Sequence, residues 1–214
     1  MSKPVKRGYS SALRAAQARE TRRKIVSTAA QLFVDDGYGA STIDAIADAA
    51  GVSRKTVFSA AGGKVDLLKL AIEWAVAGDD APVAVVDRDA MRTVLGETDA
   101  TALLRSWASV TTKIDARSAR LFQALEIAAG TDVEARALAG RFERRRLDGA
   151  RLVITRLTSL NALSPRLKRG EAVDLAWLST DPVLYDRLVR VRNWSASRFE
   201  KWLGDSLCRQ LVAT

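Results

Sequence analysis

Apolar residues recur along this chain with the spacing of amphipathic helices, and no segment alternates at period two over a useful length. An apolar stripe from Ile25 to Phe33 predicts a first helix over residues 21–36, or starting earlier, and Gly37 ends it. A further amphipathic segment follows Lys64 and stops at Gly78, so its helix would connect two bodies. Beyond a loop over residues 78–88, the pattern predicts helices near residues 89–95, 99–113, 115–129, 132–159, 169–179, 182–192 and 196–212.

Two short helices joined by a glycine turn are predicted between Ser41 and Phe58. The spacing of Ser41 and Asp44 is that of a capping box, which predicts a helix start at Ser41. The helix then places four apolar side chains on one face: Ile43, Ile46, Ala47 and Ala50. Gly51 can adopt the left-handed conformation that closes a helix, and Ser53 is a cap residue for the second helix.

The second helix of this pair begins with polar and basic side chains, Arg54, Lys55 and Thr56. They are donors to phosphates and base edges, and a helix N-terminus itself favours an anion. The segment is therefore typical of a helix-turn-helix that presents side chains to DNA. An ordinary helical hairpin with a solvated polar end is the alternative.

Cap residues also delimit helices later in the chain. Thr131 and Glu134 have the spacing of a capping box, and Ser195 would cap the last helix. Asp181 precedes Pro182, which suits a cap followed by proline at the first helical position.

Composition excludes most catalytic chemistry. The chain has 214 residues, of which 48% are hydrophobic, and it contains no histidine and a single cysteine, Cys208. It cannot form a Ser-His-Asp triad, an internal disulfide or the common zinc and iron sites, and we find no paired-acid motif and no phosphate-binding glycine loop. We therefore expect no metal, no cofactor and no enzymatic activity. Without a long apolar run or a signal peptide, we expect a soluble cytoplasmic protein that does not bind membranes.

Positive charge is concentrated at the N-terminal end. Residues 1–64 carry 11 Lys or Arg against 5 Asp or Glu, whereas residues 65–214 carry 23 against 20. A basic arm and first helical turn would lie along phosphates or enter a minor groove. Its side chains are Lys3, Lys6, Arg7, Arg14, Arg19, Arg22, Arg23 and Lys24. For residues 1–10 a disordered, solubilising tail is an equal alternative.

Residues 25–68 resemble the DNA-binding domain of TetR/AcrR-type transcriptional regulators. The resemblance rests on these residues: Ala29, Ala30, Leu32, Phe33, Gly37, Tyr38, Thr42, Ile46, Ala47, Ala50, Gly51, Val52, Ser53, Thr56, Val57, Phe58, Lys64, Leu67 and Leu68. It implies an all-α fold, with an N-terminal three-helix helix-turn-helix domain and a C-terminal helical bundle for regulation and dimerisation. We divide the chain into a basic arm (1–20), a DNA-binding domain (21–64) and a ligand-binding and dimerisation domain (65–214).

The resemblance assigns roles to single residues. Thr42 and Thr56 would bind phosphates, Arg54 and Lys55 would reach bases or nearby phosphates, and Lys64 would contact the DNA backbone. Three further residues would pack in the domain: Ala45, Val52 and Val57.

The chain departs from the family after Val57. Phe58 replaces the usual tyrosine, so it can fill the core but offers no hydroxyl to a phosphate. Ser59, Ala60 and Ala61 follow in place of a polar residue, an aromatic or histidine, and phenylalanine. The second helix of the pair would be the recognition helix. Because Ala61 lacks a large ring and Gly62-Gly63 follows it, the joint that packs this helix onto the bundle would be loosened. Either the basic arm, Arg54, Lys55 and Ser59 compensate, or DNA binding is weaker and less specific.

For the C-terminal half, the family implies a cavity for a small-molecule effector and a two-fold dimer. Ligand candidates are Trp107, Phe122, Leu125, Glu126, Phe142 and Tyr185, although core packing alone would explain each of them. Dimer candidates lie on the last helices: Leu175, Trp177, Phe199, Trp202, Leu203, Leu207 and Leu211. A monomer core would use the same residues.

The function that these features favour is a ligand-responsive repressor that binds a palindromic operator on double-stranded DNA as a homodimer, in the cytoplasm and associated with the nucleoid. The alternative is a helical ligand-binding or interaction module with weakened, non-specific DNA binding.

Overall fold

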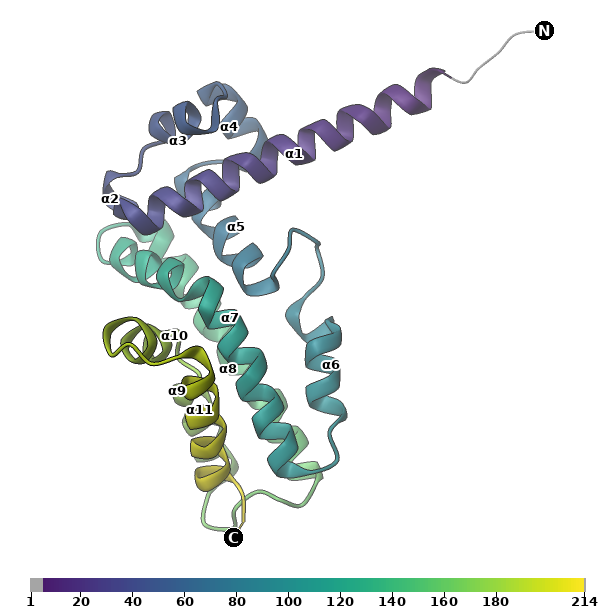
Figure 1. Cartoon of the computed structure of the whole chain (residues 1–214), viewed down its shortest axis with the longest axis vertical. Helices are drawn as coiled ribbons and strands as arrows, with labels where there is room; N and C mark the ends of the chain where they lie inside the picture. Colours follow the sequence, from purple (N-terminus) through teal and green to yellow (C-terminus); the bar gives the residue numbers. More distant parts are fainter. Residues whose placement is uncertain (1–5, 214) are drawn as a thin grey trace, which may run out of the picture.

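The computed structural model describes the backbone of residues 6–213, and this part of the chain is built from helices (Figure 1). Its one pairing of extended backbone is an isolated antiparallel bridge between Leu163 and Val212. The all-α prediction is confirmed. The elements are α1 (Lys6–Asp35), α2 (Gly37–Ala40), α3 (Ile43–Ala50), α4 (Arg54–Ala61), α5 (Lys64–Ala77), the 3-10 turn η1 (Val85–Asp87), α6 (Asp89–Gly96), α7 (Ala100–Ala129), α8 (Val133–Ser159), α9 (Arg169–Ser179), α10 (Pro182–Tyr185), the π-helical η2 (Asp186–Val191) and α11 (Ala196–Leu211).

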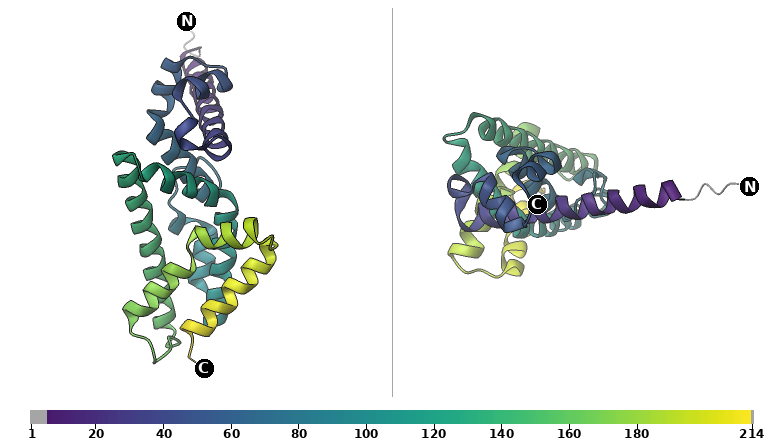
Figure 2. Two further views of the ribbon diagram at one scale, coloured as in Figure 1. Left: turned by 90° about the vertical axis from the view of Figure 1, so that its left-hand side faces the viewer. Right: turned by 90° about the horizontal axis from the view of Figure 1, so that it is seen from above.

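The helices form two bodies that meet at α5. Helices α1 to α4 lie at one end of the molecule, and the long α7 and α8 extend away from them to the far end, where α11 finishes (Figures 1 and 2). One apolar core joins the bodies, because Phe33 of α1, Leu68 of α5 and Leu125 of α7 belong to the same buried cluster. A second cluster fills the space between α7, α8, α9 and α11.

The first helix is longer than the predicted one. It begins at Lys6, so residues 6–20, expected as an arm, form its first half and project beyond the rest of the molecule (Figure 2, right). The segment Ser11–Glu20 is rich in alanine and arginine, which have high helix propensity. Lys3 lies outside the described residues, as do the side chains of Lys6 and Arg7.

A single helix, α7, replaces the two helices predicted over residues 99–113 and 115–129. No glycine or proline interrupts this stretch, and buried side chains continue through the expected break, with Thr111 before it and Ser118 after it. The helix therefore extends across both bodies and forms a wall of each core.

Three predicted caps are confirmed and two are displaced by one residue. Ser53, Asp181 and Ser195 each accept a backbone N–H of the helix that follows. Thr42 caps α3 in place of Ser41, because the Ser41 hydroxyl donates to Gly37 O at 2.9 Å. Asp132, not Thr131, caps α8, accepting from the Glu134 and Ala135 amides.

Candidate nucleic-acid interface

The turn between α3 and α4 has the geometry that the sequence predicts. Gly51 has φ +65°, and the Val52 amide donates to Ala47 O at 2.9 Å, which closes α3. The Ser53 hydroxyl accepts the Thr56 amide at 3.1 Å and thereby starts α4. Val57 is fully buried, so α4 is packed on its inner face and exposed on its outer face. Ala45, expected to pack in this domain, is exposed on α3.

Two basic side chains lie on the exposed first turn of α4. Lys55 is exposed, and Arg54 donates from Nη1 to Asp44 Oδ2 on α3 at 2.9 Å. This pair connects the two helices of the motif, and both of its side chains are more than half exposed. Water and salt therefore weaken the pair, and a DNA phosphate competes directly with Asp44 for the guanidinium.

Phe58 does not fill the core as expected. Its side chain is 47% exposed, and the Arg54 guanidinium lies 5.7 Å from the ring centroid. The inward position one residue earlier is already occupied by Val57, so the helical spacing turns Phe58 to the surface.

The predicted hydroxyl contacts all have internal partners. Thr42 Oγ1 accepts the Ala45 amide at 3.0 Å, and Thr56 Oγ1 lies 2.8 Å from Ser53 Oγ. Ser59 donates to Thr56 O within its own helix. Each hydroxyl oxygen retains further hydrogen-bonding capacity, so these partners fix the side chains at the helix starts without excluding a phosphate.

Lys64, at the start of α5, lies over the Tyr38 ring with Nζ 4.1 Å from the centroid. Burial lowers the pKa of Lys64, whereas Asp132 opposes that shift. The Tyr38 hydroxyl donates to Asp132 at 3.1 Å, which connects α2 with the start of α8. Burial, with that hydrogen bond, raises the Tyr38 pKa. Lys64 is thus half-buried at the contact between the two bodies.

The joint between α4 and α5 is tight, which corrects the expectation that Gly62-Gly63 loosens it. Ala61 is buried in the core without a large ring. Gly62 has φ +85°, and a Cβ on it would lie 2.5 Å from Asp66 Oδ2. The Gly63 amide donates to the same carboxylate at 3.0 Å. A carboxylate therefore closes the joint that a ring was expected to close.

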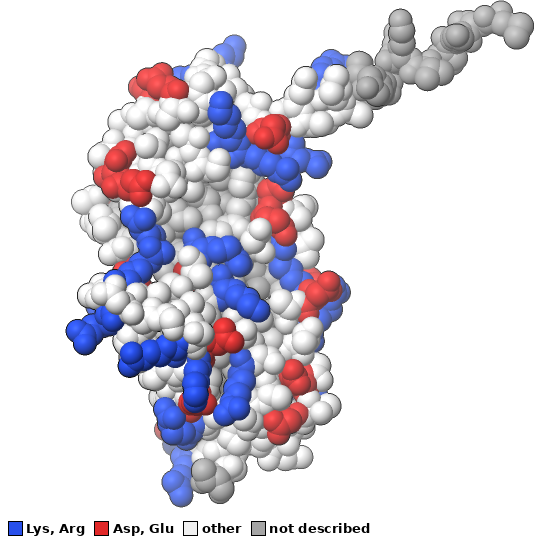
Figure 3. Space-filling view, in the orientation of Figure 1, with Lys and Arg blue, Asp and Glu red and all other residues white. Residues whose placement is uncertain are grey.

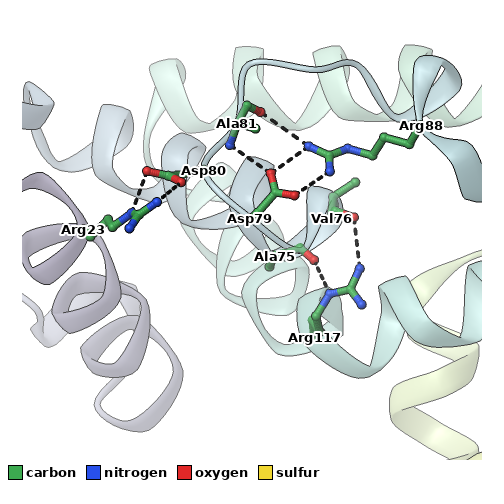
Figure 4. Close-up of polar contacts among 8 residues, drawn as sticks. All are labelled: Arg23, Ala75, Val76, Asp79, Asp80, Ala81, Arg88 and Arg117. Atoms are coloured by element: carbon green, nitrogen blue, oxygen red, sulfur yellow. Dashed lines mark hydrogen bonds and ion pairs between the residues drawn. The ribbon is translucent and has the colours of Figure 1, made fainter. Parts of the chain in front are cut away.

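Arg22 and Arg23, predicted as DNA contacts, also have partners within the chain: Arg23 contacts the segment after α5 (Figure 4), and Arg22 lies near Trp74 of α5. Arg23 donates from Nε and Nη2 to the two carboxylate oxygens of Asp80, at 2.7 and 2.6 Å. The guanidinium of Arg22 lies 6.0 Å from the centre of the Trp74 ring system on α5. Both side chains connect α1 with α5 and its C-terminal extension.

Arginine side chains hold the end of α5 and the first residues of the α5–α6 segment, residues 78–88 (Figure 4). Arg88 donates to both carboxylate oxygens of Asp79, at 2.7 and 2.9 Å, and these bonds, with that from the Ala81 amide, lower the Asp79 pKa to about 2. Arg117 of α7 donates to the carbonyls of Ala75 and Val76, the last turn of α5, at 2.7 and 3.2 Å.

A cavity of about 840 Å³ lies behind the α5–α6 segment, between α5, α7 and α8. Trp107, Phe122 and Phe142, all predicted as ligand residues, line it. The other three candidates do not. Leu125 is buried in the core shared with α1, Glu126 faces solvent, and Tyr185 packs edge-on against Phe199 at 5.1 Å.

The stripe on α11 faces the core of its own chain. Phe199, Leu203, Leu207 and Leu211 are at most 1% exposed, because α11 packs along α7 and α9. These four side chains are therefore unavailable to a second copy, which corrects their assignment to a dimer surface. Leu175, Trp177 and Trp202 remain partly exposed.

Among the described residues, the distribution of charge does not single out the helix-turn-helix, and the acidic side chains form no metal site. Basic side chains lie along α1 and also over the C-terminal half, so positive charge extends beyond the helix-turn-helix (Figure 3). Within residues 6–213, no three acidic or cysteine side chains lie together as metal ligands would. The helices of this part of the chain are too short or too polar to cross a membrane.

Comparison with known proteins agrees with this geometry. Residues 25–71 match the family model described as "Bacterial regulatory proteins, tetR family". The protein described as "Uncharacterized HTH-type transcriptional regulator TtgW", of Pseudomonas putida, is 42% identical over 55 residues. Those residues are 26% of this chain and 41% of that protein, so the sequence match spans less than half of the relative.

Solved structures share the fold over both bodies. FadR, a fatty acid degradation regulator from Bacillus halodurans, superposes with a TM-score of 0.68 at 16% identity, over 87% of this chain and 94% of that one. SmeT, the repressor of the Stenotrophomonas maltophilia multidrug efflux pump SmeDEF, gives 0.63 at 18% identity, over 89% and 90%. At such identities the likeness shows the fold alone.

The turn at Gly51, the exposed start of α4 and the helical bundle behind them define a helix-turn-helix protein with a large second body. With the match over residues 25–71, we conclude that the N-terminal body of this chain contains the DNA-binding domain of the tetR family of bacterial regulatory proteins.

Proposed function

We propose that this protein is a DNA-binding transcriptional regulator that reads double-stranded DNA with α4. The exposed first turn of α4 carries this proposal. Arg54 and Lys55 lie there beside the free backbone amides of a helix N-terminus, on a helix that Val57 fixes to the core. Thr42 and Lys64, at the starts of α3 and α5, and Thr56 and Ser59 of α4 would bind the DNA backbone.

We further propose a homodimer on a palindromic operator. A dimer presents two copies of α4, which suit two half-sites about 34 Å apart, the length of one turn of the duplex. Apolar side chains exposed on α9, α10 and η2 support a contact there, and they are Leu178, Val183 and Val191. Leu175, Trp177 and Trp202, which are partly exposed on α9 and α11, would extend it. This surface takes the place of the buried stripe of α11.

Repression controlled by an effector in the cavity is the third element of the proposal. Helix α5 lines the cavity and begins at Lys64, beside the joint of the recognition helix. Arg23 connects α1 to the cavity wall through Asp80. An effector that fits only one arrangement of α5 and α1 would favour that arrangement and so change the spacing between the two α4 helices of the dimer. The difference in the effector's affinity for the two arrangements limits how far it can shift the equilibrium between them. The protein would act in the cytoplasm, on nucleoid DNA.

A salt-dependent mobility-shift assay on the DNA that flanks its own gene tests this function. We expect affinity for that DNA to exceed affinity for random duplex by about a thousandfold, and both to fall with salt. Equal affinity for the two duplexes would contradict the proposed repressor function.

A second function is favoured by the surface of α4 itself. Phe58 offers no hydroxyl, and Arg54 is paired with Asp44, so fewer donors are free for DNA than the basic composition suggests. The protein would then be a helical ligand-binding or interaction module that binds DNA weakly and without specificity. In the same assay this function predicts salt-dependent binding with no preference for the flanking DNA.

A further inference from the structure

One buried carboxylate in the cavity wall has no partner. Asp115, in the middle of α7, is 2% exposed and lines the cavity together with Trp107 and Thr111, which lie two turns and one turn before it. Its Oδ2 atom is buried and makes no hydrogen bond within the described chain. An unsatisfied buried oxygen is costly, so it marks a position where a ligand group or water belongs.

The other acids of the wall are already neutralised. Glu73 pairs with Arg145 at 3.0 Å, and Asp148 pairs with Arg151 at 2.9 Å. Asp79 pairs with Arg88 and Asp80 pairs with Arg23 of α1 (Figure 4). Among the described carboxylates that line the cavity, Asp115 alone lacks an ion pair.

The nearest base does not supply one. Arg146 of α8 donates to Glu143 at 2.8 Å, to Asp181 at 3.5 Å and to the Trp177 carbonyl at 3.0 Å. Two carboxylates therefore already compensate its charge, and its buried Nε makes no hydrogen bond within the described chain.

The aromatic residues of the wall suit a cation. Trp74, Trp107, Phe122 and Phe142 line the cavity, and the faces of two of these rings already attract guanidinium groups. Arg22 lies 6.0 Å from Trp74, and Arg145 lies 5.4 Å from Phe142. Ring faces carry negative potential and bind ammonium groups in a desolvated site.

We propose that the cavity binds an apolar, preferably aromatic, organic cation whose ammonium group pairs with Asp115. This proposal rests on the proposed function in assigning the cavity to an effector, and it names the chemical class of that effector. The ammonium group supplies the charge and donors that Oδ2 lacks, and the apolar body is covered by the rings of α5, α7 and α8.

The burial of Asp115 in the ligand-free protein also supports this pairing, because it changes the pKa of the carboxyl group. It raises the pKa of Asp115; Arg146 lowers it again, and Asp181 adds to the rise. An empty cavity therefore favours the neutral acid, and an arriving ammonium group favours the carboxylate. Binding of the cation would therefore lower the pKa of Asp115.

Three probes of one shape test the charge preference: 4-phenylbutylamine, 4-phenylbutanol and 4-phenylbutyrate. Each is titrated into the DNA-free full-length protein at pH 7.5, with tryptophan fluorescence as the readout, because Trp74 and Trp107 line the cavity. We expect the amine to bind about tenfold more tightly than the alcohol, and the butyrate most weakly.

Asp115→Asn is the decisive variant, and Asp148→Asn, which removes an exposed lining acid that pairs with Arg151, is its control. Asp115→Asn should lower the affinity for the amine about tenfold and leave that for the alcohol within about twofold, which also shows that the cavity is intact. Tighter binding of the butyrate, no binding of the amine, or unchanged amine affinity in Asp115→Asn would overturn the proposal. None of these outcomes bears on the DNA assay, and loss of specific DNA binding would leave the amine titration unchanged.

Discussion

Arg23 and Asp80, which lie 57 residues apart, form a two-bond ion pair between α1 and the segment that covers the cavity. Helix α1 also packs against α3 and α4, so this pair connects the wall of the cavity to the domain that carries the recognition helix. A rearrangement of residues 78–88 around a ligand would therefore act on α1 directly. Rigid helices with a few polar contacts are the elements through which such coupling travels.

We predict that Arg23 acts mainly in this contact and not on the DNA surface, and a double-mutant cycle tests that prediction. Arg23→Gln and Asp80→Asn should each lower the unfolding temperature slightly, and the double variant should lower it no further, because both remove one interaction. DNA affinity should respond alike to the two changes. A loss of DNA affinity in Arg23→Gln alone would instead place this arginine on the duplex.

Gly62 should tolerate no side chain. Its φ of +85° is unfavourable for other residues, and the added Cβ would lie 2.5 Å from Asp66 Oδ2. Gly62→Ala should lower the free energy of unfolding by about 1–3 kcal/mol in urea denaturation. Gly39→Ala is the matched control, because nothing lies within 4 Å of a Cβ there. Equal effects of the two substitutions would contradict a tight joint.

Phe58→Tyr should strengthen DNA binding without changing stability. The ring is 47% exposed beside Arg54, so the added hydroxyl would be in contact with solvent in the free protein. It would donate a hydrogen bond to a phosphate only in the complex with DNA. We expect about a two- to fivefold gain in affinity, which is the contribution of one hydrogen bond, by fluorescence anisotropy on the flanking DNA. Unchanged affinity would place residue 58 away from the duplex.

Asp115 should make the stability of the free protein depend on pH. Folding raises the pKa of this acid, so its neutral form favours the folded state below the unfolded pKa of about 4, and that advantage is lost as the pH rises towards the folded pKa. The unfolding temperature of Asp115→Asn relative to the unchanged protein should therefore increase between pH 4 and pH 7.5. A pH-independent difference would mean that Asp115 is already ionised and compensated.

The sequence predicts the helix-turn-helix well because its signals are local. Gly51 and Ser53 fix a chain reversal over a few residues, and the stripe of α3 matches its buried face. The predicted break near Asp115 was wrong because one polar residue among apolar ones resembles a helix end. Whether such a residue ends a helix or faces a cavity depends on helices far along the chain.

The cavity also has a signal in the sequence, although a weaker one. Trp107, Thr111, Asp115, Ser118 and Phe122 follow one another at spacings of four, four, three and four, which places them on one face of one helix. A lone acid on such a stripe is typical of a polar group within a pocket. The apolar stripe of α11 could not be interpreted from the sequence alone. The same spacing of apolar residues fits a buried core and a dimer interface, and only the packing of α11 on α7 distinguishes them.

DNase footprinting of the DNA that flanks its own gene, with the unchanged protein and with the double variant Arg54→Ala, Lys55→Ala, tests the central claim that α4 reads DNA. The unchanged protein should protect two half-sites about one helical turn apart, and the double variant should protect neither at the same concentration. Lys168→Ala with Arg169→Ala, at the exposed start of α9 in the other body, is the control and should leave the footprint intact. An unaltered footprint with the α4 double variant would contradict the account.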